Sequence, residues 1–244
     1  MTITSPHNER LREIRKLARR RSREQSGRFV AEGEDLLAAA DAAGWRTLER
    51  YCATGSGLDG VEVEPDLLAS VSQLGSGTRA LGVYEQRWAD APAGPLCVAL
   101  HGIADPGNVG TILRSALAFG ASSVALGPGC ADPFGAKAVR ASMGALFAIP
   151  LARFDTVGAL PGTTVALDAH AEEPIAVLAE LEGPLTLLLG AERAGLPADV
   201  LSACDRVVRI PIHSESLNAA MAATVALYEV SRGAVATDHR MPPA

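Results

Sequence analysis

The sequence predicts an α/β protein with two domains, the second of which is built on a parallel sheet. Short apolar runs such as Leu185–Leu189 end abruptly in small and polar residues, which is typical of strands buried on both faces of a parallel sheet. From Leu96 onward these runs alternate with helical stretches, the pattern of repeated strand–helix units. Residues 88–95 fit neither pattern and contain two prolines, so we expect a linker there.

The composition allows a sizeable core and hides an uneven distribution of charge. The 244 residues are 48% apolar and carry a formal net charge of −6 at pH 7. Residues 1–28 nevertheless hold nine basic and three acidic side chains, a local charge of +6 that leaves −12 for the rest. This one-signed excess indicates an anionic partner that the net charge alone would not predict.

The sequence gives no reason to expect a metal site, a disulfide framework or a membrane segment. The four cysteines lack the close pairs of zinc sites, so we expect small buried side chains at Cys52, Cys97, Cys130 and Cys204. The amino terminus is charged, and no apolar run approaches the roughly 20 residues that span a bilayer. A cytoplasmic protein is therefore expected.

The first domain is expected to begin with a basic helix over residues 8–24. Leu11, Ile14 and Leu17 recur at helical spacing, and Asn8 is a suitable N-cap. The other faces are rich in arginine, which binds phosphate in a bidentate manner. This favours contact with an RNA or DNA backbone over a merely solvated surface with Glu–Arg pairs. The side chains expected to bind RNA are Arg15, Arg19, Arg20, Arg21 and Arg23.

The rest of the first domain reads as alternating short strands and helices. Residues 27–44 predict a strand, a turn at Gly33 and a helix that ends near Gly44. The further elements expected are strands over residues 45–53, 60–63 and 80–84 and a helix over residues 65–71.

The second domain is expected to hold the sheet and the helices that cover it. Strands are predicted over residues 96–100, 122–126, 148–151, 163–168, 185–189 and 206–210. Helices are predicted after the first strand as far as residue 119, over residues 137–146 and over residues 218–232. We place the domains at residues 1–88 and 96–233, with a linker over residues 89–95 and a flexible tail over residues 234–244.

Three loops that follow strands of the second domain form the candidate site. They cover residues 105–110, 189–196 and 213–218, and ligands of open α/β sheets bind at the carboxyl ends of the strands. None has the glycine pattern of a dinucleotide fold, and no Gly-Lys-Thr phosphate loop is present. A hydrolase is a weak alternative, because it would rest only on the closeness of His213 and Ser216 in the sequence.

Together the three loops resemble the motifs of the TrmH-like branch of the SPOUT superfamily, which are RNA ribose 2′-O-methyltransferases. Residues 105–116 are similar to motif one, residues 189–195 to motif two, and residues 210–212 with 215–218 to motif three. Residues 137–144 resemble the family's intervening helix, on which Lys137 and Arg140 would contact RNA phosphate. Residues 8–84 are more loosely similar to the small, ribosomal-protein-like substrate-binding domain of members that act on rRNA.

The resemblance implies that the second domain is tied in a trefoil knot and binds S-adenosylmethionine. The cofactor contacts that it implies are Leu189, Gly190, Ile210 and Leu217. A glycine at position 190 would let a flat ring approach closely, although an ordinary strand-end turn is the alternative. The small-residue helix after Asn218 suggests a homodimer, as the family has.

Carried over position by position, the resemblance implies an active site of Asn108, Arg114, Glu192, Ser216 and Asn218. The methyl group must meet a ribose hydroxyl in line, so much of the acceleration can come from positioning. Because a guanidinium stays protonated, we expect Arg114 to stabilise the alkoxide and grip phosphate rather than act as a base. Glu192 is expected to tether loops by bonding backbone amides beside Asn108. Ser216 and Asn218 are expected also to cap a helix.

The leading interpretation is S-adenosylmethionine-dependent methylation of a ribose 2′-hydroxyl, with 23S rRNA as the expected substrate. One departure from the family pattern is a shortened loop before Ser216, and a minor one is Ser115 where threonine is commoner. The shortened loop leaves a non-catalytic RNA-binding or ribosome-assembly factor as an alternative. A tRNA 2′-O-methyltransferase is another, and a base-methylating enzyme of the same superfamily is disfavoured by the active-site set.

Overall fold

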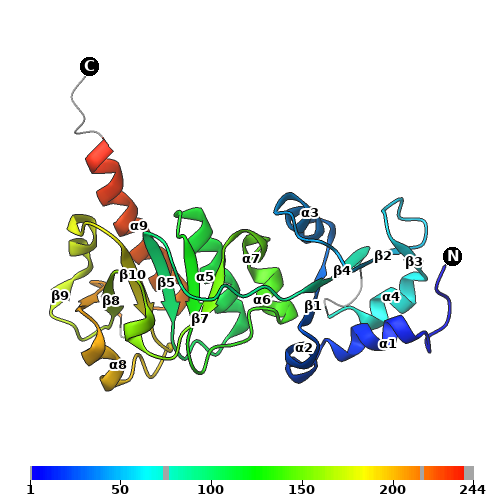
Figure 1. Ribbon diagram of the computed structural model, residues 1–244, viewed down its shortest axis with the longest axis horizontal. Helices are drawn as coiled ribbons and strands as arrows, with labels where there is room; N and C mark the ends of the chain where they lie inside the picture. The colour runs from blue at the N-terminus through cyan, green and yellow to red at the C-terminus, as the bar shows by residue number, and fades with distance from the viewer. Residues whose placement is uncertain (1, 74–76, 215–216, 239–244) are drawn as a thin grey trace, which may run out of the picture. The chain divides into compact units, whose positions relative to one another are not determined.

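The computed structural model describes residues 2–73, 77–214 and 217–238, and the chain divides into two compact units (Figure 1). The first unit is Met1–Arg87 with Asp132–Ala148, and the second is Trp88–Ala131 with Ile149–Ala244. The first boundary between the two units, between Arg87 and Trp88, thus lies at the start of the expected linker. Residues 132–148, which lie inside the range expected for the second domain, group instead with the first unit.

The first unit is built on a four-stranded sheet in the order β1-β4-β2-β3. β4 pairs antiparallel with β1 and with β2, whereas β2 and β3 are parallel. Leu11 and Ile14 of the first helix pack into one core with Val30, Tyr51 and Leu68. The strands are β1 (Arg28–Glu32), β2 (Glu49–Ala53), β3 (Val61–Val63) and β4 (Ala80–Glu85), and the helices include α3 (Glu34–Ala42) and α4 (Pro65–Val71).

The single helix expected over residues 8–24 is wrong, because the chain forms two helices there. α1 (Glu9–Lys16) ends before α2 (Arg20–Ser26) begins, and Arg19 between them is extended, with φ −93° and ψ 130°. The carbonyl oxygens of Leu17 and Ala18 accept hydrogen bonds from the Arg23 guanidinium at 2.8 and 3.0 Å. The break is therefore stabilised by a side chain whose role the apolar spacing does not reveal.

The helix expected over residues 137–146 is also interrupted. α6 (Ala136–Ala141) and α7 (Ala145–Ala148) are separated by a turn in which Met143 and Gly144 have φ values of 49° and 92°. Phe147 of α7 lies 5.1 Å from Trp45 between ring centroids, and its carbonyl oxygen accepts a hydrogen bond from the Trp45 indole at 2.8 Å. Phe29 of β1 contacts both rings, so aromatic packing joins this segment to the first unit.

The second unit contains a seven-stranded sheet in the order β7-β6-β5-β10-β8-β11-β9, and its strand pairs are parallel. The α/β class with a parallel sheet is thus confirmed. β7 starts at Leu151, just after Pro150, and not at residue 148 as expected; β9 and the 3₁₀ turn that follows it were not predicted. The strands are β5 (Leu96–Leu100), β6 (Ser123–Leu126), β7 (Leu151–Arg153), β8 (Thr163–Leu167), β9 (Glu173–Pro174), β10 (Leu185–Leu189) and β11 (Arg206–Arg209).

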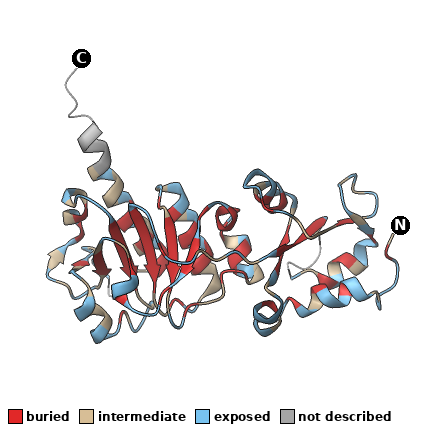
Figure 2. Ribbon diagram, viewed as in Figure 1, coloured by how far each residue is buried: buried red, intermediate tan, exposed pale blue. Residues whose placement is uncertain are grey.

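Helices cover both faces of this sheet, and its strands β5, β6 and β10 are buried throughout (Figure 2). On one face, Ala99, Ala166 and Leu188 pack with Val157 of η1 (Val157–Ala159) and, through partly buried side chains, with α8 (Ala198–Ala203). The alternating residues face the opposite side, where α5 and α9 pack against each other. The elements not yet given are α5 (Pro106–Ala118), η2 (Ile175–Glu180) and α9 (Ala219–Asp238).

The last helix extends beyond the length that the sequence predicts. α9 continues to Asp238, so five residues of the expected tail are helical, and residues 239–244 lie outside the described residues. The flexibility of the tail stays a prediction. Across the part of the chain that the structure describes, no helix has both the length and the apolar content of a membrane span.

Candidate active site

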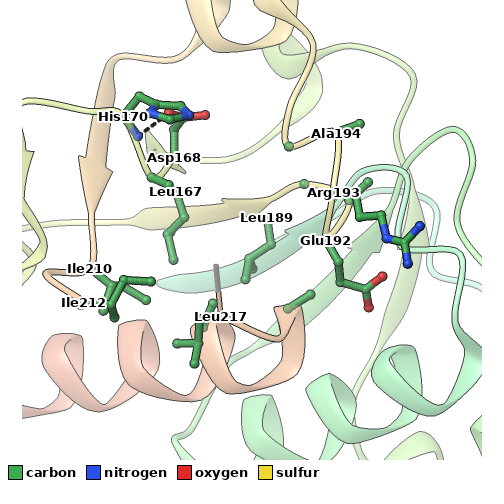
Figure 3. A pocket seen from close by; sticks show the side chains of 16 residues that line it. Leu167, Asp168, His170, Leu189, Glu192, Arg193, Ala194, Ile210, Ile212 and Leu217 are labelled. Carbon is green, nitrogen blue, oxygen red and sulfur yellow. Dashed lines mark hydrogen bonds between the residues drawn. The ribbon is translucent and has the colours of Figure 1, made fainter. Parts of the chain in front are cut away.

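The carboxyl ends of three neighbouring strands meet the beginning of α9 in one pocket (Figure 3). β10, β8 and β11 lie side by side and parallel, so their carboxyl ends share an edge of the sheet. Leu189 ends β10, Asp168 follows β8, and Ile210 follows β11. Leu217 lines the same pocket from just before α9. Three loops from distant parts of the sequence therefore form a single cavity.

The pocket has an apolar side and a polar rim. The apolar side chains are Leu167 and Leu189 in the middle of Figure 3 and Ile210, Ile212 and Leu217 below them. Asp168 and His170 lie at its upper left edge, while Glu192 and Arg193 lie at the right. Such a combination is typical of a site that binds a mostly apolar ligand and orients it through a few polar groups.

The structure brings together the four expected cofactor contacts, Leu189, Gly190, Ile210 and Leu217, all of which line this pocket. Their roles stay a prediction. The sequence reasoning missed Leu167, which ends β8, and Asp168 and His170, which follow it. It also missed Arg193 and Ile212. The loop after β8 resembles no motif, but the rule that ligands bind at strand ends would have drawn attention to it.

Gly190 is required by the packing of its own loop, whatever ligand the pocket holds. A Cβ atom on Gly190 would lie 2.5 Å from the carbonyl carbon of Gly195 and 2.6 Å from the nitrogen of Leu196. Two backbone hydrogen bonds between Ala191 and Gly195, of 3.2 and 2.9 Å, close the loop against this position. A steric reason inside the protein is therefore sufficient for glycine at this position, and the close approach of a flat ring stays a prediction.

Asn108, Glu192 and Asn218 form one side-chain network. The Asn108 amide donates to Glu192 Oε1, and the Asn218 amide donates to Asn108 Oδ1 at 3.1 Å. Glu192 thus bonds the side chain of Asn108, and not the backbone amides that we expected. Asn218 Oδ1 accepts from the backbone N–H groups of Ala220 and Met221 at 2.9 and 3.3 Å, so Asn218 also caps α9. The network joins motifs one, two and three.

Arg114 does not join the pocket of its own chain. It is exposed on α5, it is absent from the pocket lining, and within the described residues it makes no hydrogen bond or ion pair. Ser216 lies outside the described residues, so its expected role is not addressed. Within a single chain, Arg114 therefore does not line the pocket that holds the expected cofactor contacts.

Among the residues expected to bind RNA, Arg23 is a correction. Its side chain is only 7% exposed and pairs with Asp132 at 2.7 Å, so it supports the fold instead of offering charge to a partner. Arg15 is half-buried and donates to Pro6 O and Ser70 Oγ. Arg19, Arg20, Arg21, Lys137 and Arg140 are exposed, and Arg20 pairs with Glu24 at 2.8 Å.

Hydrogen bonds at the other end of the strands help to hold the site edge in register. The backbone N–H and the hydroxyl of Thr164 donate to Asp205 at 2.8 and 2.7 Å, and these bonds lower the pKa of the Asp205 carboxyl. They tie the residue before β11 to β8.

Burial raises the pKa of the Cys97 and Cys204 thiols, which argues against a thiolate nucleophile. In the described residues, no group of three or more His, Cys, Asp or Glu could hold a metal ion.

Comparison with known proteins gives a consistent result for both halves of the chain. A model described as the SpoU rRNA Methylase family matches residues 95–228, and one described as an MRM3-like substrate binding domain matches residues 8–82. The 23S rRNA (uridine(2479)-2′-O)-methyltransferase of Streptomyces viridochromogenes is 30% identical, over 88% of this chain and 86% of its own. The 23S rRNA (guanosine(2553)-2′-O)-methyltransferase of Bacillus subtilis is 26% identical, over 93% of this chain and 98% of its own.

A solved structure agrees with the fold over almost the whole chain. The AdoMet-bound rRNA methyltransferase from Sinorhizobium meliloti has a TM-score of 0.86 and 30% identity, and the match covers 99% of each chain. The resemblance seen in the three loops is therefore confirmed by sequence and by structure. This chain belongs to the SpoU rRNA methylase family.

Proposed function

We propose that this protein transfers the methyl group of S-adenosylmethionine to a ribose 2′-hydroxyl of 23S rRNA. The single observation that carries the proposal is the pocket at three strand ends with the Asn108–Glu192–Asn218 network at its rim. Relatives across nearly the whole chain are named for this reaction. RNA offers the hydroxyl that DNA lacks, and a cytoplasmic location suits such a substrate.

The residues of the pocket fit the cofactor. Leu189, Ile210 and Leu217 suit the faces of an adenine ring, and Glu192 and Arg193 carry charges that complement an amino-acid ammonium and carboxylate. When bound, S-adenosylmethionine supplies an electrophilic methyl group. We propose that the fold around this pocket is the trefoil knot typical of the family.

The network at the rim fixes two amides before RNA arrives. Glu192 holds the Asn108 amide, and Asn108 holds Asn218, whose other atoms cap α9. Positioning of the ribose, rather than proton transfer, is their contribution. Arg114 stabilises the developing alkoxide and binds the adjacent phosphate through its guanidinium N–H groups.

A homodimer explains why Arg114 lies outside the pocket of its own chain. Met221, Val225 and Tyr228 are exposed at helical spacing along α9, and α5 adds exposed Leu117 beside them. Arg114 precedes Leu117 by three residues, so both lie on one face of α5. Burial of this apolar stripe against a second copy brings Arg114 of each protomer to the pocket of the other.

Mixing two inactive variants tests this arrangement. Arg114→Ala removes the guanidinium, and Leu217→Arg blocks the cofactor pocket of a separate preparation. If the sites are shared, each heterodimer pairs one intact pocket with one intact Arg114, and random mixing restores about a quarter of the unsubstituted activity on rRNA. Methyl transfer is measured with labelled cofactor, and nuclease digestion with mass spectrometry locates the methyl on ribose.

Two results would contradict the proposal in different ways. Full methyl transfer by Arg114→Ala alone removes the role of Arg114. A mixture that stays inactive, although mass spectrometry detects the heterodimer, shows that the two sites are independent. Calorimetry with S-adenosylmethionine on Arg114→Ala is the control, because a folded pocket should still bind the cofactor.

The exposed arginines of the first unit supply the electrostatic contact with RNA. Arg19, Arg20 and Arg21 are exposed, as are Lys137 and Arg140 of α6, which belongs to the same unit. Neutralisation of RNA phosphates releases counterions, so the affinity for rRNA falls steeply with salt.

A further inference from the structure

Asp168 is a charged residue in the pocket that belongs to none of the three family-like loops. It follows β8, the strand that lies between β10 and β11. Its backbone N–H donates to Val208 O of β11 at 3.0 Å. The sheet therefore fixes the place from which this carboxylate enters the pocket.

The two carboxylate oxygens of Asp168 are in different situations. Oδ1 accepts the backbone N–H of His170 at 2.7 Å, which sets the orientation of the side chain (Figure 3). Oδ2 makes no hydrogen bond within the described residues, and it would lie 3.7 Å from a Cβ atom built on Gly195. One oxygen is thus held by the protein, while the other faces the loop across the pocket and can accept from a ligand.

The position of the reacting group indicates which half of the cofactor Asp168 meets. On the function proposed above, the methyl group lies beside Asn108 and Asn218, and Asn108 is bonded to Glu192. Glu192 and Arg193 lie at one edge of the pocket, and Asp168 lies at another (Figure 3). The charged amino-acid tail suits the edge with Glu192 and Arg193, which leaves the nucleoside half for Asp168.

We propose that Asp168 recognises the ribose hydroxyls of the cofactor. A ribose presents two neighbouring O–H donors, and a carboxylate with a free oxygen accepts such donors strongly. An acidic residue in the pocket of a dinucleotide fold binds ribose in the same chemical manner. This inference rests on the proposed function and adds to it a residue that sets the preference for a ribonucleoside.

Binding of cofactor fragments tests the assignment without a need for turnover. The probe is 5′-methylthioadenosine, which keeps the nucleoside and lacks the amino-acid tail, and S-adenosylhomocysteine is compared with it by calorimetry. Asp168→Asn keeps an oxygen for His170 N–H and loses the negative charge. We expect this variant to bind both compounds about tenfold to a hundredfold more weakly. Asp155→Asn, an exposed acid outside the pocket, removes the same charge and should leave both affinities unchanged.

A second ligand comparison is decided on the unsubstituted protein, so its main result does not depend on the folding of a variant, and Asp168→Asn serves only as a check. The 2′,3′-dideoxy form of 5′-methylthioadenosine should bind about tenfold more weakly or worse, and Asp168→Asn should not weaken it further. Equal binding of the two nucleosides overturns the proposal.

The remaining outcomes separate this inference from the proposed function. If Asp168→Asn weakens the binding of S-adenosylhomocysteine but not of 5′-methylthioadenosine, the carboxylate binds the ammonium of the tail and the ribose assignment is wrong. If Asp168→Asn binds both compounds as the unsubstituted protein does, the inference fails while the proposed function stands. If the unsubstituted protein binds neither compound, the proposed function fails and the inference falls with it.

Discussion

At the scale of single residues, the loop from Gly190 to Gly195 depends on the absence of one methyl group. An alanine at position 190 would place its Cβ against the backbone of Gly195 and Leu196, which cannot move aside as a flexible side chain would. We expect Gly190→Ala to lower the free energy of unfolding by about 1–3 kcal/mol and to weaken cofactor binding, because Glu192 and Arg193 lie on the displaced loop. Urea unfolding and calorimetry measure the two effects.

Gly158→Ala is the matched control for this prediction. Gly158 lies in η1, it has no positive φ, and nothing approaches within 4 Å of the Cβ that alanine would add. Its unfolding free energy should change little or rise slightly. If the two alanine variants are equally stable, the steric account of Gly190 does not hold.

The roles of site residues could be predicted where the residues belong to a motif, but not where burial in the fold decides the role. Asn108, Glu192 and Asn218 come from loops that resemble family motifs, and the structure brings these three side chains into one network. Arg23 was misread because a count of charges does not distinguish an exposed arginine from a buried one. Asp168 was missed because a lone aspartate after a strand carries no motif.

At the scale of elements, the strands follow from their apolar runs more closely than the helices follow from their periodicity. A run such as Leu185–Leu189 is buried on both faces and has a sharp beginning and end. The break between α1 and α2 depends on side-chain hydrogen bonds of Arg23, and the break between α6 and α7 lies where Gly144 approaches Ala39. Gly144 gave a signal for the second break, and its added Cβ would lie 2.6 Å from that of Ala39, but no glycine or proline marks the first.

The same substitution at two arginines of α2 should therefore have different effects, on stability at Arg23 and on RNA binding at Arg21. Arg23→Met leaves Asp132 without its partner in a nearly buried position, so we expect a loss of about 3–5 kcal/mol in unfolding free energy. Arg21→Met removes an exposed charge and should keep stability within about 0.5 kcal/mol. In RNA binding, Arg21→Met should lower the slope of log affinity against log salt by about 1.

Urea unfolding and RNA titration at several salt concentrations check this pair. A salt slope that Arg21→Met leaves unchanged would remove α2 from the RNA contact. A stability that Arg23→Met leaves unchanged would mean that the pair with Asp132 adds little to the first unit.

At the scale of the whole molecule, the order of elements along the chain does not coincide with the division into units. The linker expected over residues 89–95 is marked by prolines and begins just after Arg87, where the first part of unit one ends. The return of residues 132–148 to that unit depends on Phe134 and Phe147, whose partners lie about a hundred residues earlier. In the sequence the two rings flank the helix predicted over residues 137–146, and no local pattern identifies Phe29 or Trp45 as their neighbours.

A fragment cut at residue 87 should for this reason fold poorly by itself. It keeps Phe29, Trp45 and Tyr84 but lacks Phe134, which lies 4.9 Å from Phe29 between centroids, and Phe147, whose carbonyl oxygen accepts the Trp45 indole N–H. Trp45 is the one tryptophan within residues 1–87, so its fluorescence reports on this cluster. We expect red-shifted emission and binding of an apolar dye, because aromatic rings that are buried in the full chain become exposed.

A chain in which residues 132–148 follow residue 87 through a Gly/Ser linker should recover blue-shifted emission and a cooperative transition. If residues 1–87 alone unfold cooperatively with Trp45 emission like that of the joined fragment, the first unit does not need the returning segment.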